Sequence, residues 1–246
     1  MRIWVRILLG AALLSVALAV GGALLHKSGI ASFGPVSLIV QAGFGLSIIV
    51  AVCTIVTLFV SILRKQPYGL FTMFATFLIC FLLGGYAAFI FNKVSNSPFL
   101  HNVSTDLVEP PVFSEAMLER RGPNSNPVTF DEHTKQLHRE AYGDVQPVVV
   151  QTSESMSFSK ALELVQDRGW EIVTMDEQAG VIEATATTFW MGFKDDVAIR
   201  MRRNEEANAT TIDIRSISRV GRTDLGKNAA RIREFLKDLN EVLPQS

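Results

Sequence analysis

The sequence predicts an α+β protein, in which an N-terminal three-helix transmembrane region precedes a two-layer domain made of a helix, a four-stranded antiparallel sheet and a second helix. The chain of 246 residues is 48% hydrophobic with a mean hydropathy of +0.27, more apolar than an ordinary soluble domain. Residues 1–93 carry six Lys or Arg and no Asp or Glu, so their formal charge is +6, whereas 94–246 carry −7. The chain therefore has one part suited to lipid and one suited to water.

Three apolar runs, at about 7–25, 43–63 and 69–91, account for the transmembrane region 1–93. Each has roughly the 20 residues that a helix needs to cross a hydrocarbon core of about 30 Å. None holds an ionisable side chain, so an anchor is favoured over an ion or proton pathway. The first run resembles a cleavable signal peptide weakly, with small residues at 17–19, but its apolar stretch continues past that point and favours a retained helix.

The basic residues that flank the spans predict the orientation of the chain. Short loops rich in Lys and Arg stay in the cytoplasm. Arg2, Arg6, Arg64 and Lys65 share one side of the membrane, against Lys27 and Lys93 on the other. We therefore expect a multi-pass protein of the bacterial inner membrane, with a cytoplasmic N-terminus and a periplasmic C-terminal domain.

Residues 94–147 form a segment rich in Pro, Asn and Ser, which we expect to be extended apart from one short helix at about 131–141. His133 and His138 lie in this stretch without a nearby third ligand, and we expect both on the surface. Cys53 and Cys80 fall within the spans, so the polar domain has no disulfide, thiol nucleophile or thiolate metal site.

The compact domain is predicted at 148–246. Apolar residues at helical spacing from Phe158 to Val165 indicate a helix capped by Ser157. A second helix is indicated at 225–243. Between them lie four strand-like runs joined by short turns, which imply antiparallel hairpins: 170–175, 180–188, 195–203 and 210–220.

Alternation along these strands places five charged residues on one face of the sheet: Glu183, Arg200, Arg202, Asp213 and Arg215. This face is either solvated and crossed by ion pairs or covered by the 99–147 segment. Asp195 and Asp196 are adjacent on one strand, so their side chains point to opposite faces and cannot share a site without a bulge.

The stretch GRTDLGK at 221–227 matches the spacing of a phosphate-binding loop, but its context fails. Asn228 stands where a magnesium-binding Ser or Thr is needed, and the sheet reads as antiparallel. We expect Asp224 to cap the following helix and Asn228 or Arg231 to tie the turn to a neighbour. The alternative is an anion site formed by the helix N-terminus with the bordering arginines, Arg215, Arg219, Arg222 and Arg231.

Three stretches together resemble the domain of unknown function 1499 family: STDLVEPPVF at 104–113, ATATTFWMGFKDDVAIR at 184–200 and SRVGRTDLGKNAARIREFL at 218–236. The resemblance covers most of 99–240. It implies a domain of bacterial envelopes, or of plastids in photosynthetic lineages, with no established activity and no catalytic residues to carry over. Its marker residues suggest a possible functional surface: Asp106, Asp195, Asp196, Arg219, Asp224, Asn228 and Arg231.

These observations favour a binding or scaffold module of the cell envelope. The lipid bilayer is the first partner, and envelope proteins or an anionic envelope ligand are the further candidates. We predict no cofactor and no metal site, and the charge of −7 disfavours nucleic acid. The alternative is an envelope hydrolase acting on an anionic substrate, with Asp195 or Asp196 and Arg219 or Arg231 at its centre.

Overall fold

The computed structural model describes residues 2–65, 69–206 and 208–243, so the last three residues of the predicted compact domain lie outside it. Two compact units make up the chain. The first holds the residues up to Asn96 together with Phe189–Gly192, and the second holds Ser97–Thr188 with the residues from Phe193 onward. Each unit is described by itself below.

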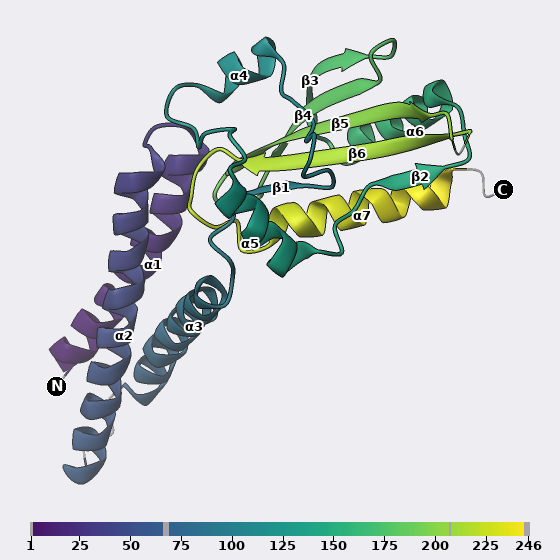
Figure 1. Ribbon diagram of the computed structural model, residues 1–246. Helices are drawn as coiled ribbons and strands as arrows, with labels where there is room; N and C mark the ends of the chain where they lie inside the picture. Colours follow the sequence, from purple (N-terminus) through teal and green to yellow (C-terminus); the bar gives the residue numbers. More distant parts are fainter. Residues whose placement is uncertain (1, 66–68, 207, 244–246) are drawn as a thin grey trace. The chain divides into compact units, whose positions relative to one another are not determined.

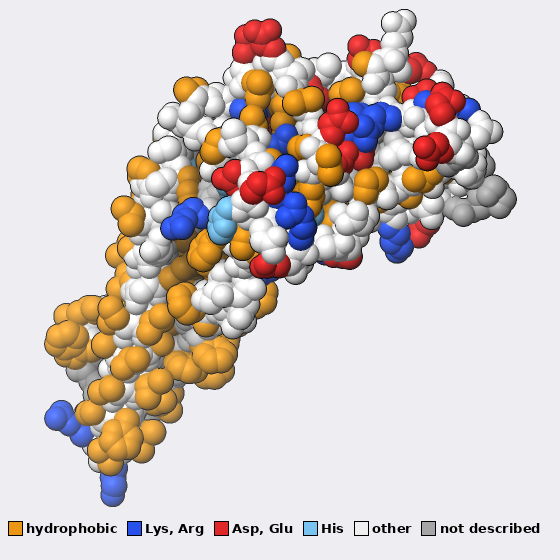
Figure 2. Space-filling view, viewed as in Figure 1, with side chains coloured by type: hydrophobic (Ala, Val, Ile, Leu, Met, Phe, Trp, Pro, Cys, Tyr) orange, Lys and Arg blue, Asp and Glu red, His pale blue; other side chains and the backbone are white. Residues whose placement is uncertain are grey.

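Three long helices form the first unit: α1 (Arg2–Lys27), α2 (Phe33–Leu63) and α3 (Leu70–Ser95). All three are long and apolar enough to cross a membrane. Hydrophobic side chains cover most of their visible surface in Figure 2. Helix α2 begins before the predicted second span at 43–63, and Pro35 lies in its first turn, where a missing N–H is tolerated.

Small side chains form the contact between α1 and α2. Ser15 and Ala19 of α1 face Gly43 of α2, where a Cβ atom would lie 2.7 Å from the Ser15 carbonyl oxygen. The buried residues of α2 recur at intervals of three, four or seven, which keeps them on one helical face: Val36, Gly43, Ser47, Val50, Thr54 and Ser61. Apolar side chains outside this seam are suited to lipid as well as to protein, so the close packing of small residues accounts for the contact between the helices.

The second unit is an α+β domain built on one antiparallel sheet (Figure 1). The predicted four strands are confirmed, and two short strands join them. The elements in chain order are β1 (Asn102–Ser104), α4 (Glu115–Arg121), α5 (Glu132–Tyr142), β2 (Val148–Val150), α6 (Glu154–Asp167), β3 (Glu171–Asp176), β4 (Val181–Thr187), β5 (Lys194–Asn204), β6 (Ala209–Ser218) and α7 (Lys227–Val242).

The sheet order is β1-β6-β5-β4-β3, and β2 also pairs with β6. β1 and β2 share one edge of β6, since Asn102 pairs with Ile217 and Val148 with Ile212. The long β5–β6 ladder runs unbroken from the Asp195–Ser218 pair to the Asn204–Ala209 pair. This ladder fixes which side chains face each side of the sheet.

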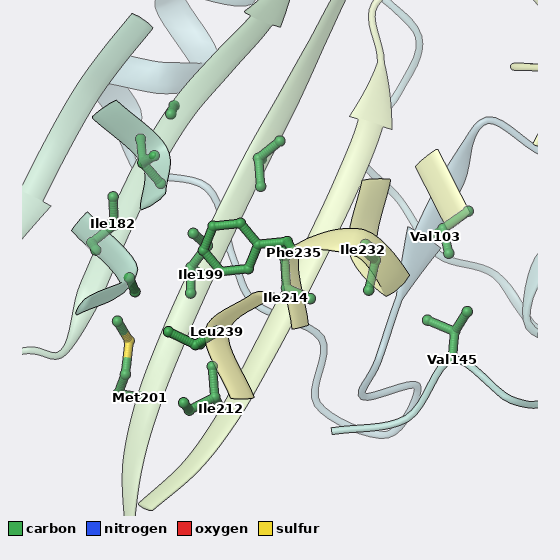
Figure 3. Close-up of a cluster of buried hydrophobic side chains, with 14 of the residues drawn as sticks. Val103, Val145, Ile182, Ile199, Met201, Ile212, Ile214, Ile232, Phe235 and Leu239 are labelled. Carbon is green, nitrogen blue, oxygen red and sulfur yellow. The ribbon is translucent and has the colours of Figure 1, made fainter. Parts of the chain in front are cut away.

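The main core lies between the sheet and helices α6 and α7. Figure 3 shows Phe235 and Leu239 of α7 directed toward Ile199 and Ile214 on the central strands. All four side chains are almost fully buried. Burying a side chain of this size contributes roughly 1.5–3 kcal/mol, so α7 is held mainly by its apolar face.

Residues 105–130, here called the covering segment, lie over the opposite face of the sheet. Phe113 and Met117 of this segment pack on Ala198 and Ile217 of the strands. α4 begins at Ser114, whose hydroxyl accepts a hydrogen bond from the Met117 amide. The segment expected to be mainly extended therefore contains a second helix and completes the domain.

Two local predictions were wrong. Ser153, not Ser157, caps α6, because its side chain accepts from the Met156 amide, whereas Ser157 is buried inside the helix and bonds to Thr152. His138 is not on the surface but 1% exposed, since it lies on the inner face of α5. The helix itself was predicted within one residue at each end.

We expect Gly43→Ala to destabilise the helical unit by about 1–3 kcal/mol, because the new Cβ atom would meet backbone on α1. Gly45→Ala on the same helix is the matched control, since its Cβ atom would meet nothing within 4 Å. Thermal denaturation of the detergent-solubilised chain compares the two. Equal stability of both variants would contradict the close-packed seam.

Candidate functional site

Asp196 lies at the centre of a buried ion-pair cluster on the covered face of the sheet. Its carboxylate accepts from Arg121 Nη1 at 2.6 Å and from Arg219 Nη2 at 2.8 Å. The Thr185 hydroxyl also donates to it, at 2.8 Å. The Asp196 side chain is fully buried, so two cations and one hydroxyl replace the water that it would bind in the unfolded chain.

Arg121 reaches this cluster from the last residue of α4. Its side chain is 3% exposed, and its guanidinium also donates to the Asn126 carbonyl at 2.9 Å. Burial lowers the pKa of Arg121, while the Asp196 charge acts in the opposite direction. An arginine retains its proton at neutral pH even so, and the ion pair therefore ties α4 to strand β5.

Arg215 is a buried cation whose hydrogen-bond partners are all neutral. It donates to Asn102 Oδ1 at 3.1 Å, to the Pro111 carbonyl at 3.0 Å and to the Val128 carbonyl. The rings of Phe113 and Phe130 lie 5.1 and 5.7 Å from its guanidinium carbon. Burial, with a smaller effect of Arg121, lowers the pKa of Arg215 to about 10, so it is charged at neutral pH.

A second cluster surrounds Asp213. One of its oxygens, Oδ2, accepts from Arg200 at 3.0 Å and from Arg202 at 2.9 Å. The same two arginines bind Asp106 Oδ2, at 3.3 and 3.2 Å, so a loop of the covering segment is joined to the strands. Asp213 Oδ1 is buried and has no hydrogen-bond partner among the described residues.

Asp106 also organises its own loop. Its Oδ1 accepts from the amides of Val108 and Glu109, both at 2.9 Å. Burial alone would raise the pKa of Asp106, but these two hydrogen bonds and the neighbouring Arg200 and Arg202 charges outweigh it and lower the pKa. Asp106 is therefore an ionised anchor for the turn that follows β1.

A third cluster of polar side chains lies on the helix-covered face of the sheet, at the end of the apolar core. Asp195 accepts from Arg231 at 2.6 Å, and Arg231 also donates to Ser216 at 2.9 Å. Asn228 donates to the His101 carbonyl and to the Ser218 hydroxyl, both at 3.0 Å. These contacts join the first turn of α7 to β6 and to the residues before β1.

The Asp224 carboxylate binds the backbone amides at the helix start that a bound phosphate would need. Its two oxygens accept from the amides of Gly226, at 2.8 Å, and Asn228, at 2.6 Å. Burial raises its pKa, and Asp195 acts in the same direction. The preceding Gly221 has a φ of +93°, as a tight turn into the helix requires. The N-cap residue of α7 is Gly226, not Asp224 as predicted, but the Asp224 carboxylate binds the amides at the helix start, so the GRTDLGK turn is a structural feature of that start.

The seven residues of the predicted functional surface therefore separate onto two faces. Asp196 and Arg219 share the covered face with Asp106, which lies in the neighbouring cluster. Asp195 lies on the helix-covered face with Arg231, as strand alternation predicts. All of these side chains have protein partners, so the geometry does not bring them together in one open site. The described residues contain no group of three or more His, Cys, Asp or Glu side chains suited to a metal ion.

Two members of this network were missed from the sequence. Arg121 lies 75 residues before its partner Asp196, and no local pattern signals such a pair. Ser114, also in the covering segment, donates from its amide to Glu183 at 2.7 Å. The only signal was the helix-start pattern of Ser114 followed by Glu115, which would have placed α4 but not its contacts.

His138 is a buried titratable group beside this network. Its Nε2 accepts from the Ser104 amide at 3.4 Å, and its Nδ1 has no hydrogen-bond partner among the residues described. The rings of Phe130 and Tyr142 contact it edge-on. Burial lowers the pKa of His138 to about 4, so it is neutral in the folded domain at pH 7.

Comparison with known proteins gives one family. The family model described as "Protein of unknown function (DUF1499)" matches residues 102–239, which include the sheet, both clusters on the covered face and most of α7. No curated protein matches the chain.

We expect Asp196→Asn to destabilise the domain by about 3–5 kcal/mol, because two buried guanidiniums lose their only shared carboxylate. Asp144→Asn is the control. Its ion pair with Arg233 has the same length of 2.6 Å but is largely exposed, so its loss costs at most about 1 kcal/mol. Denaturant unfolding of the detergent-solubilised chain measures both, and equal losses would contradict a structural role for the buried pair.

We expect the domain to lose stability as the pH falls from 6.5, the ordinary pKa of histidine, to about 4. In this window the unfolded chain binds a proton at His138 while the folded domain does not, so unfolding is favoured by up to about 3 kcal/mol. Denaturant unfolding at pH 7 and pH 4.5 measures the change. His138→Gln removes this part of the pH dependence, whereas His133→Gln, at an exposed position, retains it. An unchanged pH dependence in His138→Gln would refute the assignment.

Proposed function

The chain belongs to the DUF1499 family, a family of unknown function, and we propose that it is a membrane-anchored binding module that presents a rigid loop to a protein partner. The proposal rests on the geometry of the domain. The three apolar helices supply the anchor. The loop is residues 106–112, between β1 and α4.

The observation that carries this proposal is a loop with immobilised backbone and exposed apolar side chains. Val108 is 92% exposed and Val112 79% exposed. Between them, the Glu109 carbonyl accepts from Arg200 at 2.8 Å and the Pro111 carbonyl accepts from Arg215 at 3.0 Å. A loop already held in one conformation loses little entropy when it binds, which favours affinity.

The apolar character of the loop favours a protein over an anionic ligand. Val108 and Val112 offer no hydrogen-bond donor beyond the backbone, and the adjacent Glu109 carboxylate, which pairs with Arg202 at 2.8 Å, would repel an anion. A partner with an apolar pocket of matching shape fits this surface. Envelope proteins are therefore the partner class that we propose first.

The same geometry favours binding over the alternative, an envelope hydrolase. A general acid or nucleophile must contact its substrate. Asp195 and Asp196 are 3% and 0% exposed, and each is paired with arginine. A structural role therefore explains Asp195 and Asp196, the two carboxylates considered for catalysis.

For the cellular setting, we propose the inner membrane with a cytoplasmic N-terminus and the DUF1499 domain in the periplasm. The support is the excess of Lys and Arg in the segments around Arg2 and Arg64 over those around Lys27 and Lys93. C-terminal fusions to a reporter active only outside the cytoplasm, and to one active only inside it, test this orientation. Activity of the cytoplasmic reporter alone would overturn it.

We expect a photo-crosslinking amino acid at position 108 to give one discrete protein adduct in cells, because this side chain points away from the domain. Val112→Asp should reduce that adduct at least about tenfold, since a charge in an apolar interface costs more than about 1.4 kcal/mol. The control position is 175, where Met is 61% exposed on β3 outside the loop. Equal adducts at 108 and 175, or no adduct at 108, would contradict a specific binding loop.

A further inference from the structure

The hairpin between β4 and β5 ends in exposed aromatic residues. Phe189 is 86% exposed and Trp190 is 47% exposed. The base of the hairpin is closed by two hydrogen bonds, from the Thr188 amide to the Phe193 carbonyl and from the Phe193 amide to the Thr188 hydroxyl, both at 2.8 Å. Two large apolar side chains therefore project from a closed turn rather than from a loose loop.

The tip of this hairpin, Phe189–Gly192, belongs to the same compact unit as the three long helices. Lys27 Nζ donates to the Phe189 carbonyl at 2.7 Å and lies 4.6 Å from the centre of the Phe189 ring. His26 Nδ1 donates to the Met191 carbonyl at 2.6 Å. Two consecutive residues at the end of α1 thus hold the backbone of the tip.

Gly192 permits this close approach. A Cβ atom at this position would lie 2.9 Å from the Lys27 Cα atom, and its φ of +68° is also unfavourable for other residues. The contact between α1 and the tip therefore depends on backbone geometry as well as on the two side-chain hydrogen bonds.

The length of α1 gives the depth of the tip in a membrane. Its 26 residues extend about 39 Å at 1.5 Å per residue, longer than a hydrocarbon core of about 30 Å. Lys27, the last residue of α1, then lies at the level of the lipid headgroups, where a long basic side chain directs its charge toward water. The backbone carbonyls of Phe189 and Met191 are bound to this end of the helix, so the tip that carries Phe189 and Trp190 shares its depth.

From these contacts we infer that the Phe189–Gly192 tip is an interfacial membrane anchor, with Phe189 and Trp190 inserted at the boundary between headgroups and acyl chains. The partner is the lipid bilayer itself. Aromatic side chains concentrate at this depth because an apolar ring and a polar edge are both accommodated there. The inference rests on the proposed function in one respect, that α1 spans the membrane.

The test uses the full chain reconstituted in vesicles that contain lipids brominated near the headgroup end of the acyl chain. Trp4→Phe removes the tryptophan of α1, and Trp4→Phe/Trp190→Phe is the matched control that retains only Trp170 of the sheet domain. The difference in fluorescence between the two proteins reports Trp190 alone. Brominated lipid is expected to quench about half or more of this difference, as for a ring buried about 5–10 Å into the interface.

Three outcomes are distinguishable. Quenching by brominated lipid supports the anchor. Quenching of the Trp190 emission by aqueous iodide instead, or by neither reagent, overturns it, because the ring is then in water or covered by protein. Alkaline carbonate extraction of the same vesicles tests the anchor helices separately: a released chain means that the proposed function fails, whereas a retained chain with unquenched Trp190 means that only the tip inference fails.

Discussion

The ion pair between Asp196 and Arg121 is the interaction on which the architecture of the domain depends. It joins a central strand to a helix that lies 75 residues earlier in the chain, and Arg219 completes the pairing from the end of β6. Because the Arg121 and Asp196 side chains are almost fully buried, their charges are stable only while the covering segment stays on the sheet. The segment is consequently a second layer of the domain and not a linker between the three apolar helices and the sheet.

Local patterns in the sequence predicted much of this fold. The contacts between residues far apart in the chain could not be predicted from those patterns. Alternation placed Asp195 and Asp196 on opposite faces, and Asp224 was expected at the start of α7, where its carboxylate binds the Asn228 amide although Gly226 is the N-cap residue. The position of Arg121 could not be foreseen, because a charge next to a proline-rich stretch usually faces solvent. His138 was misplaced for a similar reason, since its burial depends on Phe130 and Tyr142 packing around it. The candidate site residues were thus identified as important positions, while their partners required the structure.

The charged layer and the exposed loop have a common physical origin. Arginines of the sheet are directed inward, toward Asp106 and the carbonyls of the covering segment, so the same contacts that satisfy buried charge also fix the loop that carries Val108 and Val112. Rigid presentation of apolar side chains is what a binding surface needs. This relation links the structural role of the ion pairs to the proposed binding role of the domain.

Hydrogen exchange across the covering segment tests this account most directly. The amides of Thr105 and Asn126 donate to carbonyls of the sheet region, Ile214 at 3.0 Å and Arg219 at 2.7 Å. If the segment is an integral layer, these amides exchange at the slow rates of the β5–β6 ladder, and Asp196→Asn accelerates the segment and the ladder together. The contrary result is that, in the unaltered chain, the amides of 105–130 exchange fast while those of the β5–β6 ladder stay protected. It would contradict the claim that the Asp196–Arg121 pair holds the two layers as one domain.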